Sequence, residues 1–130
     1  MLTTLSLWLA SFLFGGMSLF SFGFAAFLLS SLPNNTARAT IRSAFPFFYL
    51  FVLIVSMLTA LLIWRIDHVS SLLMAGIALS VIPTRQWLMP AINRATDAGQ
   101  RTRFKLLHSL SVGIGLTHII VNGYVLARFV

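Results

Sequence analysis

Cysteine is absent from this 130-residue chain, and charged residues make up only 8% of it. The absence of cysteine excludes disulfides, thiolate nucleophiles and cysteine-ligated metals. An average soluble domain carries roughly 25% charged residues, so this chain has too few charges to cover a surface that faces water. Hydrophobic residues amount to 58%. We therefore expect an integral membrane protein in contact with the lipid bilayer.

Acidic residues are also scarce. The two aspartates, Asp67 and Asp97, both fall in connections between apolar runs. This placement excludes a carboxylate relay inside the membrane and a pair of carboxylates for acid–base catalysis. A serine nucleophile needs an activating base and an orienting acid, and Ser111 near His108 lacks the third member. We expect neither an enzyme nor a metal site.

Basic residues are in excess: nine Lys and Arg give a formal net charge of +7. Proteins that bind nucleic acid gather such residues on a polar surface with recognisable motifs. Here the basic residues lie between long apolar runs, which indicates topology signals and contact with anionic lipid headgroups. We expect no nucleic-acid partner.

Four apolar runs are long enough to cross the hydrocarbon core, which takes about 20 residues in a helix. We place these spans, in a single domain over residues 1–130, at about Leu5–Leu29, Pro46–Trp64, Val69–Leu88 and Leu106–Ala127. None shows the alternation of a membrane β-barrel. The first run is far longer than the apolar region of a signal peptide, so we interpret it as a retained helix. The sequence thus predicts an all-α integral membrane four-helix bundle.

The connections carry their own expectations. Residues 36–43 could form a short interfacial helix capped by Thr36, with Arg38 and Arg42 on one side. Asp97 has Arg94 three residues before it and Arg101 four after it. This spacing predicts a local cluster of surface ion pairs around Asp97.

The distribution of basic residues predicts the orientation. Connections one and three contain Arg38, Arg42, Arg94, Arg101, Arg103 and Lys105. The opposite side has only Arg65 and Arg128. By the positive-inside rule the first group is cytoplasmic, which places the N-terminus and the C-terminus outside.

Small residues predict how the helices associate, because lipid tails provide no hydrophobic force between helices and close packing takes over. The first span contains Gly15 and Gly16, and the fourth contains Gly113 and Gly115. Several of them form small-xxx-small pairs, such as Ser11 with Gly15. We expect these four glycines to pack helices one and four together; the alternative is that each of these helices packs on helices two and three.

A polar row follows one face of the fourth span. It consists of His108, Ser111, Gly115, His118 and Asn122, at spacings of 3, 4, 3 and 4 residues. At 1.5 Å per residue the row extends roughly 20 Å, and polar groups at that depth must face the bundle interior or water. A ligand site or path formed by His118, Asn122, Ser111 and His108 is one interpretation. The other is that His118 only hydrogen-bonds a neighbouring helix.

Haem is a natural cofactor to test, because four-helix membrane cytochromes hold it between two histidines at the same depth. His108 and His118 lie roughly 15 Å apart along their helix, and His68 is expected at the outer surface. No two histidines of one chain share a level, so we predict no cofactor. Haem on one axial ligand, or across a dimer, stays open.

Three stretches resemble a known family. They are Leu7-Trp8-Leu9 through Gly15-Gly16 to Leu32-Pro33; Phe45-Pro46-Phe47-Phe48-Tyr49; and Pro90-Ala91-Ile92-Asn93 followed by residues 104–111. In this order they resemble bacterial membrane proteins of domain of unknown function 4149, which are similar to the eukaryotic transmembrane-protein-205 group. The resemblance implies a four-helix membrane protein and no established activity. It departs from the family pattern at Ser109, Gly115 and His118.

We therefore expect a multi-pass protein of the bacterial inner membrane that acts through helix packing. It would be a small homo-oligomer or an accessory subunit of a membrane complex. The alternative function is a binding or transport module for a small hydrophobic ligand (lipid, quinone or haem) along the polar row of the fourth helix.

Overall fold

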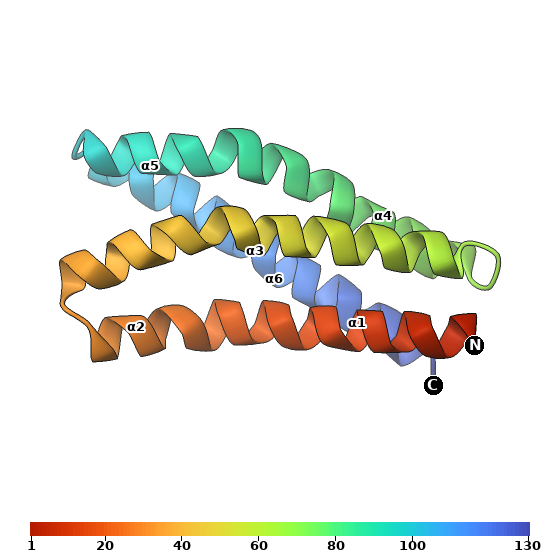
Figure 1. The fold of residues 1–130 in the computed structure, drawn as a ribbon. Coiled ribbons are helices and arrows are strands. Elements are labelled where there is room, and N and C mark those ends of the chain that lie inside the picture. Colours follow the sequence, from red (N-terminus) through yellow and green to blue (C-terminus); the bar gives the residue numbers. More distant parts are fainter.

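The computed structural model describes all residues 1–130 and consists of helices joined by short turns. Four long helical rods cross the molecule in an up-down-up-down order, with both termini at one end (Figure 1). No strand is present. The predicted four-helix, all-α fold is confirmed.

The first rod is continuous in direction but not in hydrogen-bond pattern. It comprises α1 (Leu2–Leu19), the π-helical segment η1 (Phe20–Phe24) and α2 (Ala25–Ser31). The second rod is α3 (Asn34–Ile63). Residues 36–43 belong to α3 without a break, and Thr36 is not its cap, so the prediction of a separate interfacial helix is wrong. Good helix formers such as Ala37, Arg38 and Ala39 let the span continue past the membrane surface.

The third rod consists of α4 (His68–Pro83), a second π-helical segment η2 (Thr84–Leu88) and α5 (Met89–Asp97). Pro83 and Pro90 flank η2 and have no backbone N–H, so the regular pattern of the helix loses donors on both sides of this segment. The fourth rod is α6 (Arg101–Arg128). Gly99 adopts a positive φ of 68° in the turn before it, a conformation that glycine adopts without strain.

The rods form a ring in which α1 contacts α3, α3 contacts α4, α4 contacts α6, and α6 contacts α1. Buried apolar side chains from all four fill the centre, among them Leu13, Val52, Met74 and Val125. The α6 helix crosses from α5 at one end to α1 near the termini (Figure 1). Its inner face is therefore most enclosed toward the termini, where His118 and Asn122 are buried.

Each of the four rods is long and apolar enough to cross a membrane. Large hydrophobic side chains such as Phe22, Leu61, Leu72 and Ile120 are mostly exposed on their outer faces. An aqueous surface would not tolerate so much apolar area, whereas a bilayer stabilises it. The structure is that of a multi-pass membrane protein whose lipid-facing surface surrounds a small core.

Candidate functional site

His118 lies in the part of α6 that packs most closely on its neighbours. Its side chain is only 7% exposed, and Nε2 lies 2.7 Å from Oγ of Ser80 in α4. Oγ of Ser80 is also 3.0 Å from the backbone oxygen of Ile77. When the hydroxyl donates to that oxygen, Nε2 carries the proton and donates to Ser80. The histidine therefore joins α6 to α4 by a partly buried hydrogen bond.

Asn122 lies one turn further along α6 and faces a different helix. Its side chain is fully buried, and Nδ2 donates to the backbone oxygen of Ala10 in α1 at a distance of 3.0 Å. The other side-chain atom, Oδ1, is buried with no hydrogen-bond partner. Together His118 and Asn122 fix α6 between α4 and α1.

The other two predicted ligand residues, Ser111 and His108, are in different surroundings. Oγ of Ser111 lies 3.4 Å from the hydroxyl of Tyr49 in α3, at a half-buried position. His108 is exposed and stacks on Phe104 of its own helix, with ring centroids 5.3 Å apart. The structure therefore does not bring the four predicted ligand residues into one cavity; it distributes them over three interhelical contacts and one exposed position.

The predicted packing role fits only one of the four glycines. A Cβ on Gly16 would lie 2.8 Å from the ring of Phe51, so Gly16 packs tightly, but on α3. Gly15, Gly113 and Gly115 have no other atoms within 4 Å of such a Cβ. The packing prediction is wrong for these three within the monomer, because the spacing of small residues identifies a smooth helical face without showing what that face meets.

Helices α1 and α6 do contact each other, at other residues. A Cβ on Gly123 would lie 3.2 Å from the ring of Phe14, and the bond from Asn122 to Ala10 lies next to it along α6. The approach thus occurs near the termini, roughly two to three turns further along α6 than the glycines that the sequence suggested.

Both carboxylates are held by arginines from distant parts of the chain. Asp97 forms two hydrogen bonds of 2.9 Å with Arg42 at the start of α3. The predicted local cluster with Arg94 and Arg101 is thus wrong, because Asp97, the last residue of α5, lies beside Arg42 of α3 instead. At the opposite end, Arg128 binds Asp67 through bonds of 2.8 and 3.0 Å.

Asp67 has a second function as the cap of α4. Its side chain accepts hydrogen bonds from the backbone N–H groups of Val69 and Ser70, which would otherwise be unpaired at the helix start. The hydrogen bond from Arg128, followed by the one from the Ser70 hydroxyl, holds the pKa of Asp67 well below its usual range. This carboxylate is therefore a structural anion and joins the C-terminus to the turn between α3 and α4.

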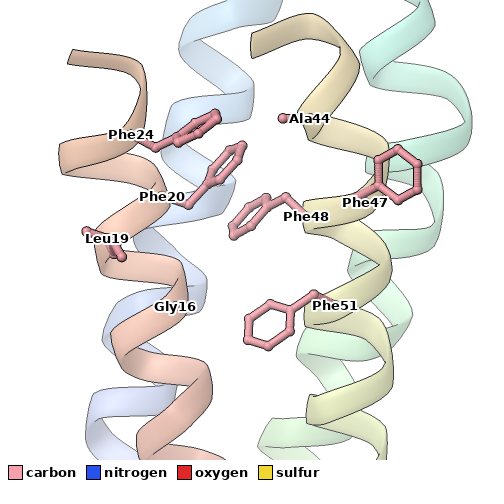
Figure 2. A pocket seen from close by; sticks show the side chains of 8 residues that line it. All are labelled: Gly16, Leu19, Phe20, Phe24, Ala44, Phe47, Phe48 and Phe51. Carbon is pink, nitrogen blue, oxygen red and sulfur yellow. The ribbon is translucent and has the colours of Figure 1, made fainter. Parts of the chain in front are cut away.

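An aromatic groove, which the residue pattern did not predict, lies between the first two rods. Its cavity measures about 470 Å³ and is lined by Gly16, Leu19, Phe20, Phe24, Ala44, Phe47, Phe48 and Phe51. Phe20, Phe24, Phe48 and Phe51 project into the space between η1 and α3 (Figure 2). The rings of Phe20 and Phe48 are nearly parallel, with centroids 4.0 Å apart. In a chain this rich in apolar residues, the five phenylalanines do not stand out in the sequence. Their common position at one groove follows only from the fold.

A second, smaller cavity of about 190 Å³ is lined by Pro46, Tyr49, Arg85, Gln86 and Met89. It lies between α3 and the segment η2. Neither cavity includes His118, Asn122, Ser111 or His108. No group of three or more His, Cys, Asp or Glu side chains is placed so that it could hold a metal ion.

These features define a polytopic α-helical membrane protein with an apolar core and a few hydrogen bonds between its helices. The chain belongs to the family described as domain of unknown function (DUF4149), whose family model matches residues 8–101. The match ends where α6 begins, so His118 and Asn122 lie outside the matched residues. No curated protein and no solved structure matches the chain.

Proposed function

We propose that this protein acts by association within the bacterial inner membrane, as a small homo-oligomer or as an accessory subunit of a larger membrane complex. The observation that carries the proposal is the outward direction of its small residues. Ser109, Gly113 and Thr117 form an exposed row on α6 at spacings of four residues, and Ser11 and Gly15 are exposed on α1. Such faces let another helix approach closely in a bilayer.

The proposal also includes the absence of catalysis. The deepest polar groups are engaged with neighbouring helices: His118 with Ser80, and Asn122 with Ala10. The two aspartates lie at opposite ends of the bundle, each bound by an arginine. No carboxylate is therefore close enough to orient or activate His118 as a general base. This arrangement is consistent with a structural role for the polar row.

Energy transfer between labelled copies in lipid vesicles tests the self-association. Because the chain has no cysteine, a single cysteine in place of Val130 can carry the label. We expect Gly113→Leu to weaken association at least tenfold, about 1.4 kcal/mol, because the added bulk prevents close approach.

Gly76→Leu is the matched control, since Gly76 is an exposed glycine on α4 that is also free of contacts. An equal loss in both variants, or no energy transfer in the unmodified protein together with no stoichiometric partner in its native mass, would contradict the proposal.

The aromatic groove supports a second candidate function, the binding of a small hydrophobic ligand such as a quinone or a lipid. Rings that stack face to face, as Phe20 and Phe48 do, can also stack on a planar conjugated ligand. The ligand would thus lie between η1 and α3 and not along α6. An absorption spectrum of the purified protein and of its organic extract distinguishes haem, quinone and lipid.

Gly16→Leu should close this groove, because any side chain at Gly16 meets the ring of Phe51 at 2.8 Å. We expect bound ligand to fall at least tenfold in this variant. Gly15→Leu, one residue earlier in open space, should retain it. Retention of the ligand by both variants would exclude this groove as the site.

A further inference from the structure

Arg85 is the basic residue that lies deepest between the helices. It belongs to η2 and is half-buried. Its Nε donates to the backbone oxygen of Pro46 in α3 at 3.2 Å, and Nη1 donates to Oε1 of its neighbour Gln86 at 3.3 Å. These bonds hold the guanidinium in one orientation across the gap between the second and third rods.

The chain provides no negative charge for this group. A guanidinium has five N–H donors, and two of those on Arg85 are used by neutral oxygens. The two side-chain carboxylates, Asp97 and Asp67, are already bound by Arg42 and Arg128. A partly buried cation without a counter-ion is unfavourable in a membrane, so a negative group from outside the chain would stabilise Arg85.

The surroundings of Arg85 indicate where that group comes from. Pro46 begins the second predicted span and Leu88 ends the third, so the guanidinium lies close to the membrane surface. Trp87, 71% exposed, lies two residues further on, as interfacial tryptophans do. The cavity of about 190 Å³ beside Arg85 has Tyr49, Gln86 and Met89 in its wall. Headgroups are the anions present at this depth.

We propose that Arg85 and this cavity bind the phosphate group of an anionic phospholipid. The planar guanidinium matches two phosphate oxygens at once, and basic pockets between membrane helices are known headgroup sites. A lipid with net negative charge is favoured over a zwitterionic one, because the positive group of a zwitterionic headgroup would be repelled by the other basic residues at this end of the bundle. These residues are Arg38, Arg94, Arg101, Arg103 and Lys105. The inference is independent of the proposed self-association.

Native mass spectrometry of the full chain in mild detergent tests the site, with phosphatidylglycerol and phosphatidylcholine as probes. We expect the unmodified protein to retain phosphatidylglycerol preferentially. Arg85→Gln should reduce its retention about tenfold, the effect of losing hydrogen bonds to a charged group. Arg85→Lys keeps the charge without the planar fork; it remains informative if the Gln variant does not fold, and should lower retention several-fold.

Arg94→Gln is the matched control: it removes one exposed arginine from the same end of the molecule, outside the cavity. An equal loss in this variant would show that the lipid preference is a property of net charge and would overturn the site. Thermal stabilisation by inorganic phosphate, equal to that by the lipid, would overturn the assignment to a headgroup. If Arg85→Gln loses a protein partner while its lipid retention is unchanged, the proposal is overturned, and the group that Arg85 binds is an acidic residue of that partner.

Discussion

His118 and Asn122 join three helices through two side chains. His118 reaches Ser80 in α4, and Asn122 reaches Ala10 in α1. Hydrogen bonds of this kind inside membranes are weak on average, since the unfolded chain also finds partners there. Their main effect is to select one packing of α6 among several that an apolar helix could adopt. The unpaired Oδ1 of Asn122 is a cost of this arrangement.

Replacing His118 by Leu tests the packing role. We expect a loss of about 0.6 kcal/mol and no more than roughly 2 kcal/mol, because Leu needs no partner and Ser80 keeps its bond to the oxygen of Ile77. Unfolding in detergent measures the change, and Ser80→Ala completes a double-mutant cycle. Two single changes that add without coupling would show that the bond between His118 and Ser80 does not contribute to stability.

The ends of the helical rods are held by ionic contacts. Arg42 and Asp97 connect α3 with α5, whereas Asp67 connects the start of α4 with Arg128 at the end of α6. Asp67 also caps α4. Each aspartate thus takes part in a contact between residues near the start of one rod and the end of the next, and Asp67 additionally determines where its helix begins.

The contact between Asp67 and Arg128 predicts a dependence on pH. The pKa of Asp67 is depressed in the folded protein, whereas an unfolded aspartate titrates near about 3.9. Its contribution to stability is therefore complete above about pH 4 and is lost as the pH falls through the folded pKa. Asn can still cap a helix, so Asp67→Asn keeps the cap and removes the charge, together with the hydrogen bonds that Oδ2 accepts from Ser70 and Arg128.

We expect the melting temperature of Asp67→Asn to lie below that of the unmodified protein at pH 7. The difference should shrink as the pH is lowered from about 5 to about 3, because the unfolded chain takes up a proton at Asp67 in this range whereas the folded chain keeps this carboxylate ionised. Thermal unfolding in detergent across this range measures it. A difference that is the same at every pH would show that the charge of Asp67 is not what stabilises the contact.

At the scale of the whole molecule, basic residues are distributed unequally between the two ends. The connections between α2 and α3 and between α5 and α6 lie together at one end, while both termini lie at the other (Figure 1). The helix ends at these connections carry six basic residues, namely Arg38, Arg42, Arg94, Arg101, Arg103 and Lys105. The positive-inside rule favours a cytoplasmic position for that end.

A reporter fused after Val130 should be active outside the cytoplasm, and one inserted at Gly99 inside it. Gly99 lies in the exposed turn between α5 and α6, which tolerates an insertion better than a helix does. Cytoplasmic activity of the C-terminal fusion would reverse the proposed orientation, while the four-helix fold would be unaffected.

The sequence by itself determined that the protein lies in a lipid bilayer, how many membrane-spanning helices it has and to which family it belongs. Few charges and four long apolar runs suffice for this, because the cost of placing polar groups in lipid is a property of each segment. It also identified His118 and Asn122 as polar residues that need an interior position. The family resemblance, confirmed over residues 8–101, added no chemistry.

Only the tertiary structure decided which faces meet. In water an apolar stripe marks the inner side of a helix, but lipid is as apolar as the core, so hydrophobicity does not distinguish inside from outside. Gly113 therefore faces outward, while Gly123 packs on Phe14. For the same reason the partners of Asp97 and Arg85, and the aromatic groove at Phe20 and Phe48, follow from how the rods are arranged and not from spacing along any one of them.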